Sequence, residues 1–144
     1  AAVVYANNEP VQLSQRGYQT NVISVADYAP IVSNGVIASE EVLENDPELV
    51  RAFARAFLRG LEDTLEDPDE AFEICKGYVE GLEENAEVQR AVLEASLAYW
   101  RGEPLGRSEP EAWRNTVEVM RGADLIEGEV DPAEAFTNAF LPQE

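Results

Sequence analysis

Histidine is absent from this chain of 144 residues, and cysteine occurs once, as Cys75. Histidine is the commonest general base and a frequent zinc ligand, so its absence excludes the usual catalytic triads and ordinary zinc sites. A single cysteine excludes an internal disulfide. Cys75 falls at an apolar position of a predicted helix, which indicates a buried structural thiol rather than a nucleophile.

Basic residues are scarce as well, because 10 Lys and Arg stand against 29 Asp and Glu, for a net charge of −19. Nucleic acids and anionic membrane surfaces are bound by clustered Lys and Arg, so the composition argues against both partners. Residues 1–38 hold only Glu9, Asp27 and Arg16 as charged residues. We interpret the acid excess elsewhere as a source of solubility or adaptation to salt or heat, with a docking face for a basic partner as the alternative.

Long apolar runs are missing too, since none approaches the roughly 20 residues of a membrane-spanning helix. The hydrophobic fraction of 45% is nevertheless sufficient for the core of one ordinary domain. Short apolar runs at residues 2–6, 21–25 and 31–38 predict three strands. A helix is expected at residues 9–17, because a proline stands in its first turn and a glycine at its end.

The pattern after Ser39 is helical. An Asp before a Pro is a helix-start signal, and it recurs at Asp46, Asp67 and Asp131. Apolar residues at helical spacing predict helices after Pro47 and around residues 71–79, 88–99 and 113–120, with a loop at residues 102–106. A few strands followed by a run of helices predict a helix-rich α/β fold in which part of the sheet is missing.

Uncharged polar residues cluster at the ends of two predicted strands, where ligand clefts commonly form. Amide side chains donate and accept hydrogen bonds, and an ionised glutamate accepts them, so the set suits a heterocycle with an amino group and ring nitrogens. Two tyrosines are candidate apolar walls. The candidate ligand-binding residues are Tyr5, Asn7, Asn8, Glu9, Tyr28, Ser33 and Asn34.

The same residues also have a structural interpretation. Asn7 and Asn8 are typical turn residues, and Glu9 is typical of the first turn of a helix, where an acid complements the dipole. The spacing of these residues in the sequence does not decide between a ligand-binding role and a structural role.

Catalytic motifs are absent from the sequence, which has no phosphate-binding glycine loop, nucleophile elbow or cluster of metal ligands. Carboxylate pairs are expected by chance among so many acids. The arginines at positions 51, 55 and 59 indicate a solvated, salt-bridged helix face more than an anion site. We therefore predict no enzymatic activity, no catalytic residues, no cofactor and no metal.

Three segments resemble one family when taken in order. They are Tyr-Ala-Asn-Asn-Glu-Pro from Tyr5, Gly-Tyr-x-x-Asn-Val-Ile-x-Val-x-Asp-Tyr from Gly17, and Val-Ser-Asn-Gly-Val-Ile from Val32. With Asn-Asp-Pro-Glu-Leu-Val from Asn45 and the tail from Asp131, they are similar to the substrate-binding proteins of ABC importers. The subgroup in question takes up thiamine pyrimidine precursors, and its relatives bind riboflavin, sulfonates or taurine.

That resemblance implies the C-terminal portion of a two-lobed periplasmic-binding-protein fold of type II, with the ligand between the lobes. Residues 1–28 would complete the second lobe as strand, helix and strand, and residues 29–144 would return to the first lobe and add its helices. Glu9 matches the family glutamate that accepts a hydrogen bond from a ligand amino group. Asn8 and the pair Ser33-Asn34 lie where the family lines its cleft.

The function implied by the resemblance is that of an extracytoplasmic solute-binding protein, periplasmic or lipid-anchored, which delivers a thiamine pyrimidine precursor or similar heterocycle to an ABC permease. A riboflavin or sulfonate binder of the same fold is one alternative, and an enzyme of pyrimidine-precursor synthesis is another. A helical interaction module without a ligand is the third. Because part of the fold is expected to be missing, oligomerisation or strand exchange is also predicted.

Overall fold

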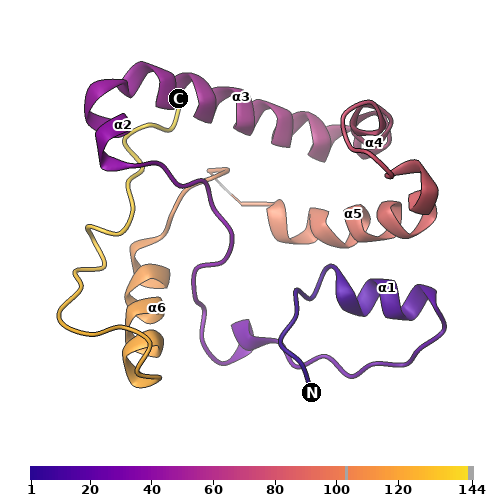
Figure 1. Cartoon of the computed structure of the whole chain (residues 1–144), viewed down its shortest axis with the longest axis horizontal. Helices are drawn as coiled ribbons and strands as arrows, with labels where there is room; N and C mark the ends of the chain where they lie inside the picture. Colours follow the sequence, from indigo (N-terminus) through magenta and orange to yellow (C-terminus); the bar gives the residue numbers. More distant parts are fainter. Residues whose placement is uncertain (103, 143–144) are drawn as a thin grey trace. The chain divides into compact units, whose positions relative to one another are not determined.

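The computed structural model describes residues 1–102 and 104–142. In this part of the chain the regular structure is helical (Figure 1). The α-helices are α1 (Glu9–Gln15), α2 (Glu40–Asn45), α3 (Pro47–Glu66), α4 (Pro68–Lys76), α5 (Ala86–Trp100) and α6 (Pro110–Gly122). Two short 3₁₀ turns are η1 (Val25–Asp27) and η2 (Glu83–Asn85). The helical predictions are confirmed, apart from the expected helix after Asp131, where the chain forms turns.

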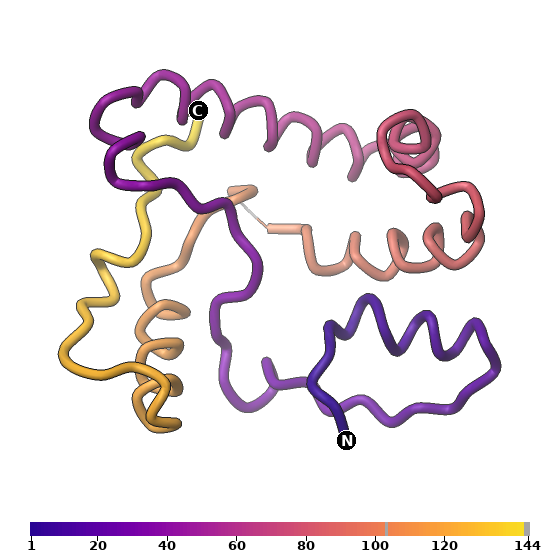
Figure 2. Tube along the Cα trace, in the orientation of Figure 1, coloured from indigo at the N-terminus to yellow at the C-terminus, as the bar shows by residue number. Residues whose placement is uncertain are grey.

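The three predicted strands are wrong, because no strand occurs among the described residues. Figure 2 shows the chain following an irregular path between α1 and α2. A strand exists only where its backbone groups bond a neighbouring strand. These apolar runs have no such neighbour in the described chain, and Val3, Ile23 and Ile37 are 99%, 78% and 95% exposed.

The helices begin where the sequence places their signals. Asp67 Oδ1 accepts a hydrogen bond from Glu70 N–H at 2.9 Å, and Asp46 Oδ1 accepts one from Leu49 N–H at 3.3 Å. These bonds satisfy amide donors that a helix leaves unpaired at its start. At the end of α1, Gly17 adopts a φ of 81°, a left-handed conformation that favours glycine.

Cys75 is exposed, which contradicts the predicted buried thiol. The buried position of α4 is Phe72, which is 4% exposed, whereas Ile74 two residues later is 57% exposed. The apolar face of this short helix is therefore narrow. Only the side of the helix that carries Phe72 is covered, and Cys75 is exposed to solvent.

Two compact units divide the chain. Unit 1 comprises Ala1–Ile23 and Leu58–Leu105, and unit 2 comprises Ser24–Phe57 and Gly106–Glu144. The long helix α3 contributes to both units. The lobes predicted at residues 1–28 and 29–144 stay predictions.

Unit 1 is built around α5, against which α1 and α4 pack. Its buried apolar side chains are Leu58, Phe72 and Leu97, each less than a tenth exposed. The loop predicted at residues 102–106 is irregular where it is described, and Glu103 lies outside the described residues.

Unit 2 centres on α6, whose Val117 is 7% exposed. The Trp113 ring stacks on Phe136 with centroids 5.6 Å apart. Asn138 ties the tail to the start of α6, since its amide group donates to Ser108 O and accepts from Ser108 N, both at 2.9 Å. The tail is thus held by side chains rather than by a helix of its own.

Candidate functional site

The turn that precedes α1 carries four of the predicted ligand-binding residues, and it is closed by two hydrogen bonds. Asn8 N–H donates to Tyr5 O at 3.0 Å. Tyr5 N–H in turn donates to the Glu9 Oε2 atom at 3.0 Å. Glu9 is the first residue of α1, with Pro10 directly after it. Its carboxylate therefore fixes the turn and also complements the positive end of the helix.

Asn7 is directed toward α5. Its Nδ2 donates to the Ser96 Oγ at 2.8 Å. Ser96 is 3% exposed, and its hydroxyl donates to Val92 O at 2.7 Å. One proton of the Asn7 amide is thus bound inside unit 1.

Asn8 is half-buried, and its Oδ1 accepts a hydrogen bond from Gln12 Nε2 at 2.7 Å. Its backbone carbonyl accepts from Gln12 N–H at 3.0 Å. Asn8 is the N-cap of α1, although its side chain makes no capping bond to the helix backbone. These bonds confirm the turn interpretation of Asn7 and Asn8, and the ligand interpretation stays a prediction.

The other predicted residues belong to unit 2. Tyr28 ends η1 and is 81% exposed, and Ser33 and Asn34 lie in an exposed irregular segment. This segment is attached to α6, because Val32 N–H donates to Thr116 Oγ1 at 2.9 Å and Asn115 Nδ2 donates to Pro30 O at 3.1 Å. The ligand contacts assigned to all seven residues stay predictions.

The sequence interpretation missed the helix side chains that hold these segments, Ser96, Asn115 and Thr116. Ser96 and Thr116 lie far from their partners in the sequence, 89 and 84 residues away. One signal was present for Ser96. It is a polar residue one turn after Val92 on the face predicted to be apolar, where a hydroxyl needs a partner.

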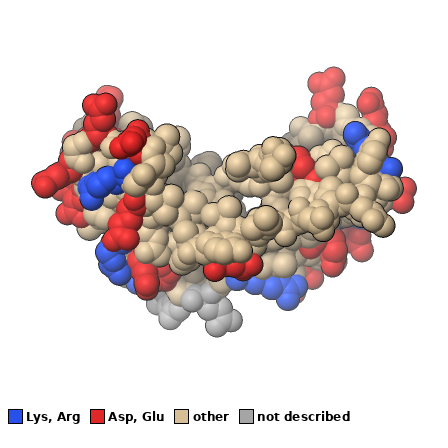
Figure 3. All heavy atoms as spheres, turned by 90° about the horizontal axis from the view of Figure 1, so that it is seen from below, with Lys and Arg blue, Asp and Glu red and all other residues tan. Residues whose placement is uncertain are grey.

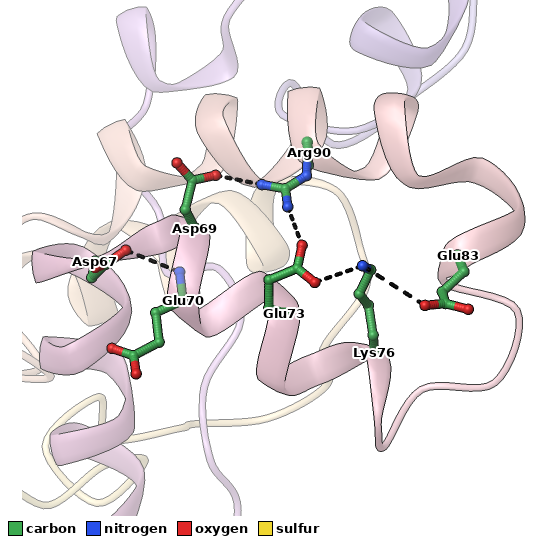
Figure 4. A network of polar contacts seen from close by, with 7 residues as sticks. All are labelled: Asp67, Asp69, Glu70, Glu73, Lys76, Glu83 and Arg90. Carbon is green, nitrogen blue, oxygen red and sulfur yellow. Dashed lines mark hydrogen bonds and ion pairs between the residues drawn. The ribbon is translucent and has the colours of Figure 1, made fainter.

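A cluster of charges joins α4 to α5 in unit 1 (Figure 4). The Arg90 guanidinium binds Asp69 and Glu73 and lies 4.3 Å from the Phe72 ring centroid. Lys76 Nζ lies 2.6 Å from Glu73 Oε2. The hydrogen bond from Lys76 holds the pKa of Glu73 below its ordinary value of 4.5. The cluster is solvent-exposed and satisfied within itself, so it fits a structural clamp better than a ligand site.

The described residues offer no group of side chains suited to a metal ion. A hollow of about 110 Å³ next to Arg90 is lined by Pro68, Asp69, Leu93 and Glu94, and is small for a heterocycle. Figure 3 shows a face made mostly of uncharged residues, on which acidic side chains outnumber basic ones. None of the described helices has the length and apolar character needed to cross a bilayer.

Comparison with known proteins supports the resemblance. Residues 1–71 match the family model described as NMT1/THI5 like. The chain is 44% identical, over 98% of its length, to the riboflavin-binding protein RibY of Chloroflexus aurantiacus. It is also 28% identical, over 93% of its length, to the formylaminopyrimidine-binding protein of Halalkalibacterium halodurans.

The chain spans 42% of the length of each of these two relatives. No solved structure matches it significantly. The match of residues 1–71 to this family model and the similarity to the two binding proteins confirm the resemblance drawn from the sequence motifs. Both relatives are named as binding proteins, which at the family level favours binding over catalysis.

Proposed function

We propose that this chain belongs to an extracytoplasmic solute-binding protein that captures a small heterocycle and delivers it to an ABC permease. The observation that carries the proposal is the 44% identity, across nearly the whole chain, to a riboflavin-binding protein. The turn before α1, in which the polar residues of the motif lie close together, is a second support.

Riboflavin is the first ligand we propose, and a formylaminopyrimidine is the second. The identity to the riboflavin-binding relative is 44%, against 28% to the formylaminopyrimidine-binding one. This ranking differs from that drawn from the motifs, which placed a thiamine pyrimidine precursor first. The two ligands share a pyrimidine ring, whose edge presents N–H donors next to acceptor atoms.

Glu9 and Asn8 suit such an edge. A carboxylate has about four acceptor positions, so the bond from Tyr5 N–H leaves Glu9 able to accept from a ligand N–H. The Asn8 amide can both donate and accept. Tyr5, whose side chain is exposed at the same turn, offers an aromatic surface for the ring.

Calorimetric titration tests this proposal, with riboflavin, a formylaminopyrimidine, thiamine and taurine added in turn to the purified full-length protein. We expect heat of binding from riboflavin, or from the pyrimidine, and none from taurine. Glu9→Gln removes the negative charge but keeps the shape. Losing a hydrogen bond to a charged group costs about 1.5–3 kcal/mol, so affinity should fall roughly tenfold to a hundredfold.

Glu41→Gln is the matched control, because Glu41 is also an acid in the first turn of a helix, in α2. It should leave the affinity unchanged. An equal loss in both variants would show that net charge, not Glu9, supports binding. Absence of heat from all four compounds would contradict the proposed function.

A further inference from the structure

The buried hydroxyl of Ser96 connects two parts of unit 1 that are far apart in the sequence. Ser96 lies on α5 and is 3% exposed. It donates to Val92 O within its own helix and accepts from Asn7 Nδ2, which is 89 residues away in the chain. Buried polar groups are retained where they find partners. Here the second partner is the turn that carries the proposed ligand contacts.

Asn7 occupies the middle of that turn. The turn is already closed on itself by the bonds from Asn8 N–H to Tyr5 O and from Tyr5 N–H to Glu9. Because the turn is closed, fixing one of its side chains on α5 places the others as well. The Asn7–Ser96 bond is therefore well suited to set where Asn8 and Glu9 stand.

Packing between the helices supports the same interpretation. Helix α1 lies against α5, and this is the most extensive of the helix contacts in unit 1. Helix α1 has only seven residues, from Glu9 to Gln15, and no buried residue of its own. So short a helix has little intrinsic stability and depends on such tertiary contacts.

We propose that Asn7 and Ser96 are positioning residues, whose hydrogen bond seats the turn Tyr5–Glu9 on α5 and thereby orients Asn8 and Glu9 toward a heterocyclic ligand. The inference rests on the proposed function for its second part. It gives Asn7 a role behind the ligand, where the sequence alone placed it among the contacts.

A double-mutant cycle tests the pair, with the variants Asn7→Ala, Ser96→Ala and the combination of both. The first measurement is amide hydrogen exchange of residues 5–9 in the ligand-free chain. Removing one net hydrogen bond should accelerate exchange there by about two- to tenfold. Each single variant should have this effect, and the combination should be no worse than the larger single effect, because both remove the same bond.

The second measurement is the dissociation constant for riboflavin. It should rise by a similar factor in the single variants and in the combination. Thr64→Ala is the matched control, since Thr64 on α3 also donates its hydroxyl to the carbonyl four residues earlier, Gly60 O, at 2.7 Å. This control separates the loss of such a helix bond from the loss of the contact with Asn7.

Unchanged exchange at residues 5–9 in either single variant would overturn the positioning role. Additive losses in the double variant would also overturn it, because the two side chains would then act separately. If the wild-type full-length protein binds neither riboflavin nor a formylaminopyrimidine, the proposed function fails. The exchange data alone then decide whether the pair holds the turn on α5.

Discussion

Two irregular segments carry the predicted ligand-binding residues, and helices hold them in opposite ways. In unit 1 the segment supplies the side chain, because Asn7 reaches Ser96 on α5. In unit 2 the helix supplies it, because Thr116 on α6 binds the backbone at Val32. The attachment in unit 1 therefore requires the amide side chain of Asn7. The attachment in unit 2 needs only the backbone N–H of Val32, so it does not depend on which side chain stands at that position.

The two units also differ in how much they bury. Leu58, Phe72 and Leu97 are buried in unit 1, whereas Val117 is the buried apolar residue in the described part of unit 2. Buried apolar surface is the main source of stability. Unit 1 should therefore depend on its core, and unit 2 on individual hydrogen bonds and on the stacked pair Trp113 and Phe136.

The largest expected effect is that of Phe72→Ala. Phe72 is 4% exposed and its ring faces Arg90, so its removal should cost about 3–5 kcal/mol. Val117→Ala in unit 2 removes two carbons and should cost about 2 kcal/mol. Urea unfolding measures both.

The two tryptophans make this comparison specific, because Trp100 lies in unit 1 and Trp113 in unit 2. Replacing either one by phenylalanine leaves a fluorescence probe for the other unit. Phe72→Ala should lower the midpoint seen by Trp100 more than that seen by Trp113. Equal shifts at both probes would mean that the units unfold together and would remove the contrast between them.

The next effect is that of Thr116→Val, which keeps the shape of the side chain and removes its hydroxyl. Val32 N–H then loses its acceptor, and an unpaired, partly buried donor costs about 1–3 kcal/mol. Amide exchange in residues 30–34 should accelerate, with exchange in residues 5–9 unchanged. The Thr116 hydroxyl also donates to Ala112 O, four residues earlier, and the Thr64 hydroxyl makes the same kind of bond to Gly60 O, both at 2.7 Å. Thr64→Val is therefore the matched control and should leave both segments unaffected.

The helices could be predicted because their signals are local. Asp67 caps α4 as its position before Pro68 indicates, and the apolar spacing after Pro47 gives α3. The same signal failed at Asp131. There Asp131 Oδ1 accepts from Ala133 N–H in a turn, and Phe136 packs on Trp113 instead of continuing a helix. A tertiary contact outweighed a local preference.

The strands could not be predicted in the same way, because pairing is not a local property. The runs at residues 2–6, 21–25 and 31–38 have the composition of strands but form no strand pairing in the described chain. The turn at Asn7 and Asn8 was among the interpretations left open by the sequence. Its attachment to Ser96 was not, since nothing in the spacing links residues so far apart.

A smaller effect is expected at two helix caps, Asp67 in unit 1 and Ser39 in unit 2. Asp67→Ala removes the bond to Glu70 N–H at 2.9 Å in unit 1 and should cost about 1 kcal/mol. Ser39→Ala removes the bond to Val42 N–H, which at 3.3 Å is longer, and should cost roughly half as much. Urea unfolding followed at Trp100 and at Trp113 compares them. A larger cost at Ser39 would show that α2 matters more to unit 2 than its six residues suggest.

The smallest effect concerns two ion pairs with the same spacing, Glu73–Lys76 in unit 1 and Glu48–Arg51 in unit 2, both 2.6 Å long. The pKa of Glu73 is depressed below 4.5, chiefly by the hydrogen bond from Lys76. Its stabilising contribution is therefore present above pH 4.5 and is lost as the pH falls through the lower folded-state value. Lys76→Gln should flatten the acid dependence of the Trp100 midpoint as the pH falls below 4.5, most clearly at low salt. Arg51→Gln should change the Trp113 midpoint less, because Arg51 and Glu48 are 41% and 78% exposed, against 25% and 53% for Lys76 and Glu73. An unaltered acid dependence in Lys76→Gln would show that the pair adds nothing to unit 1, whose stability would then rest on Phe72 and the contacts of α5.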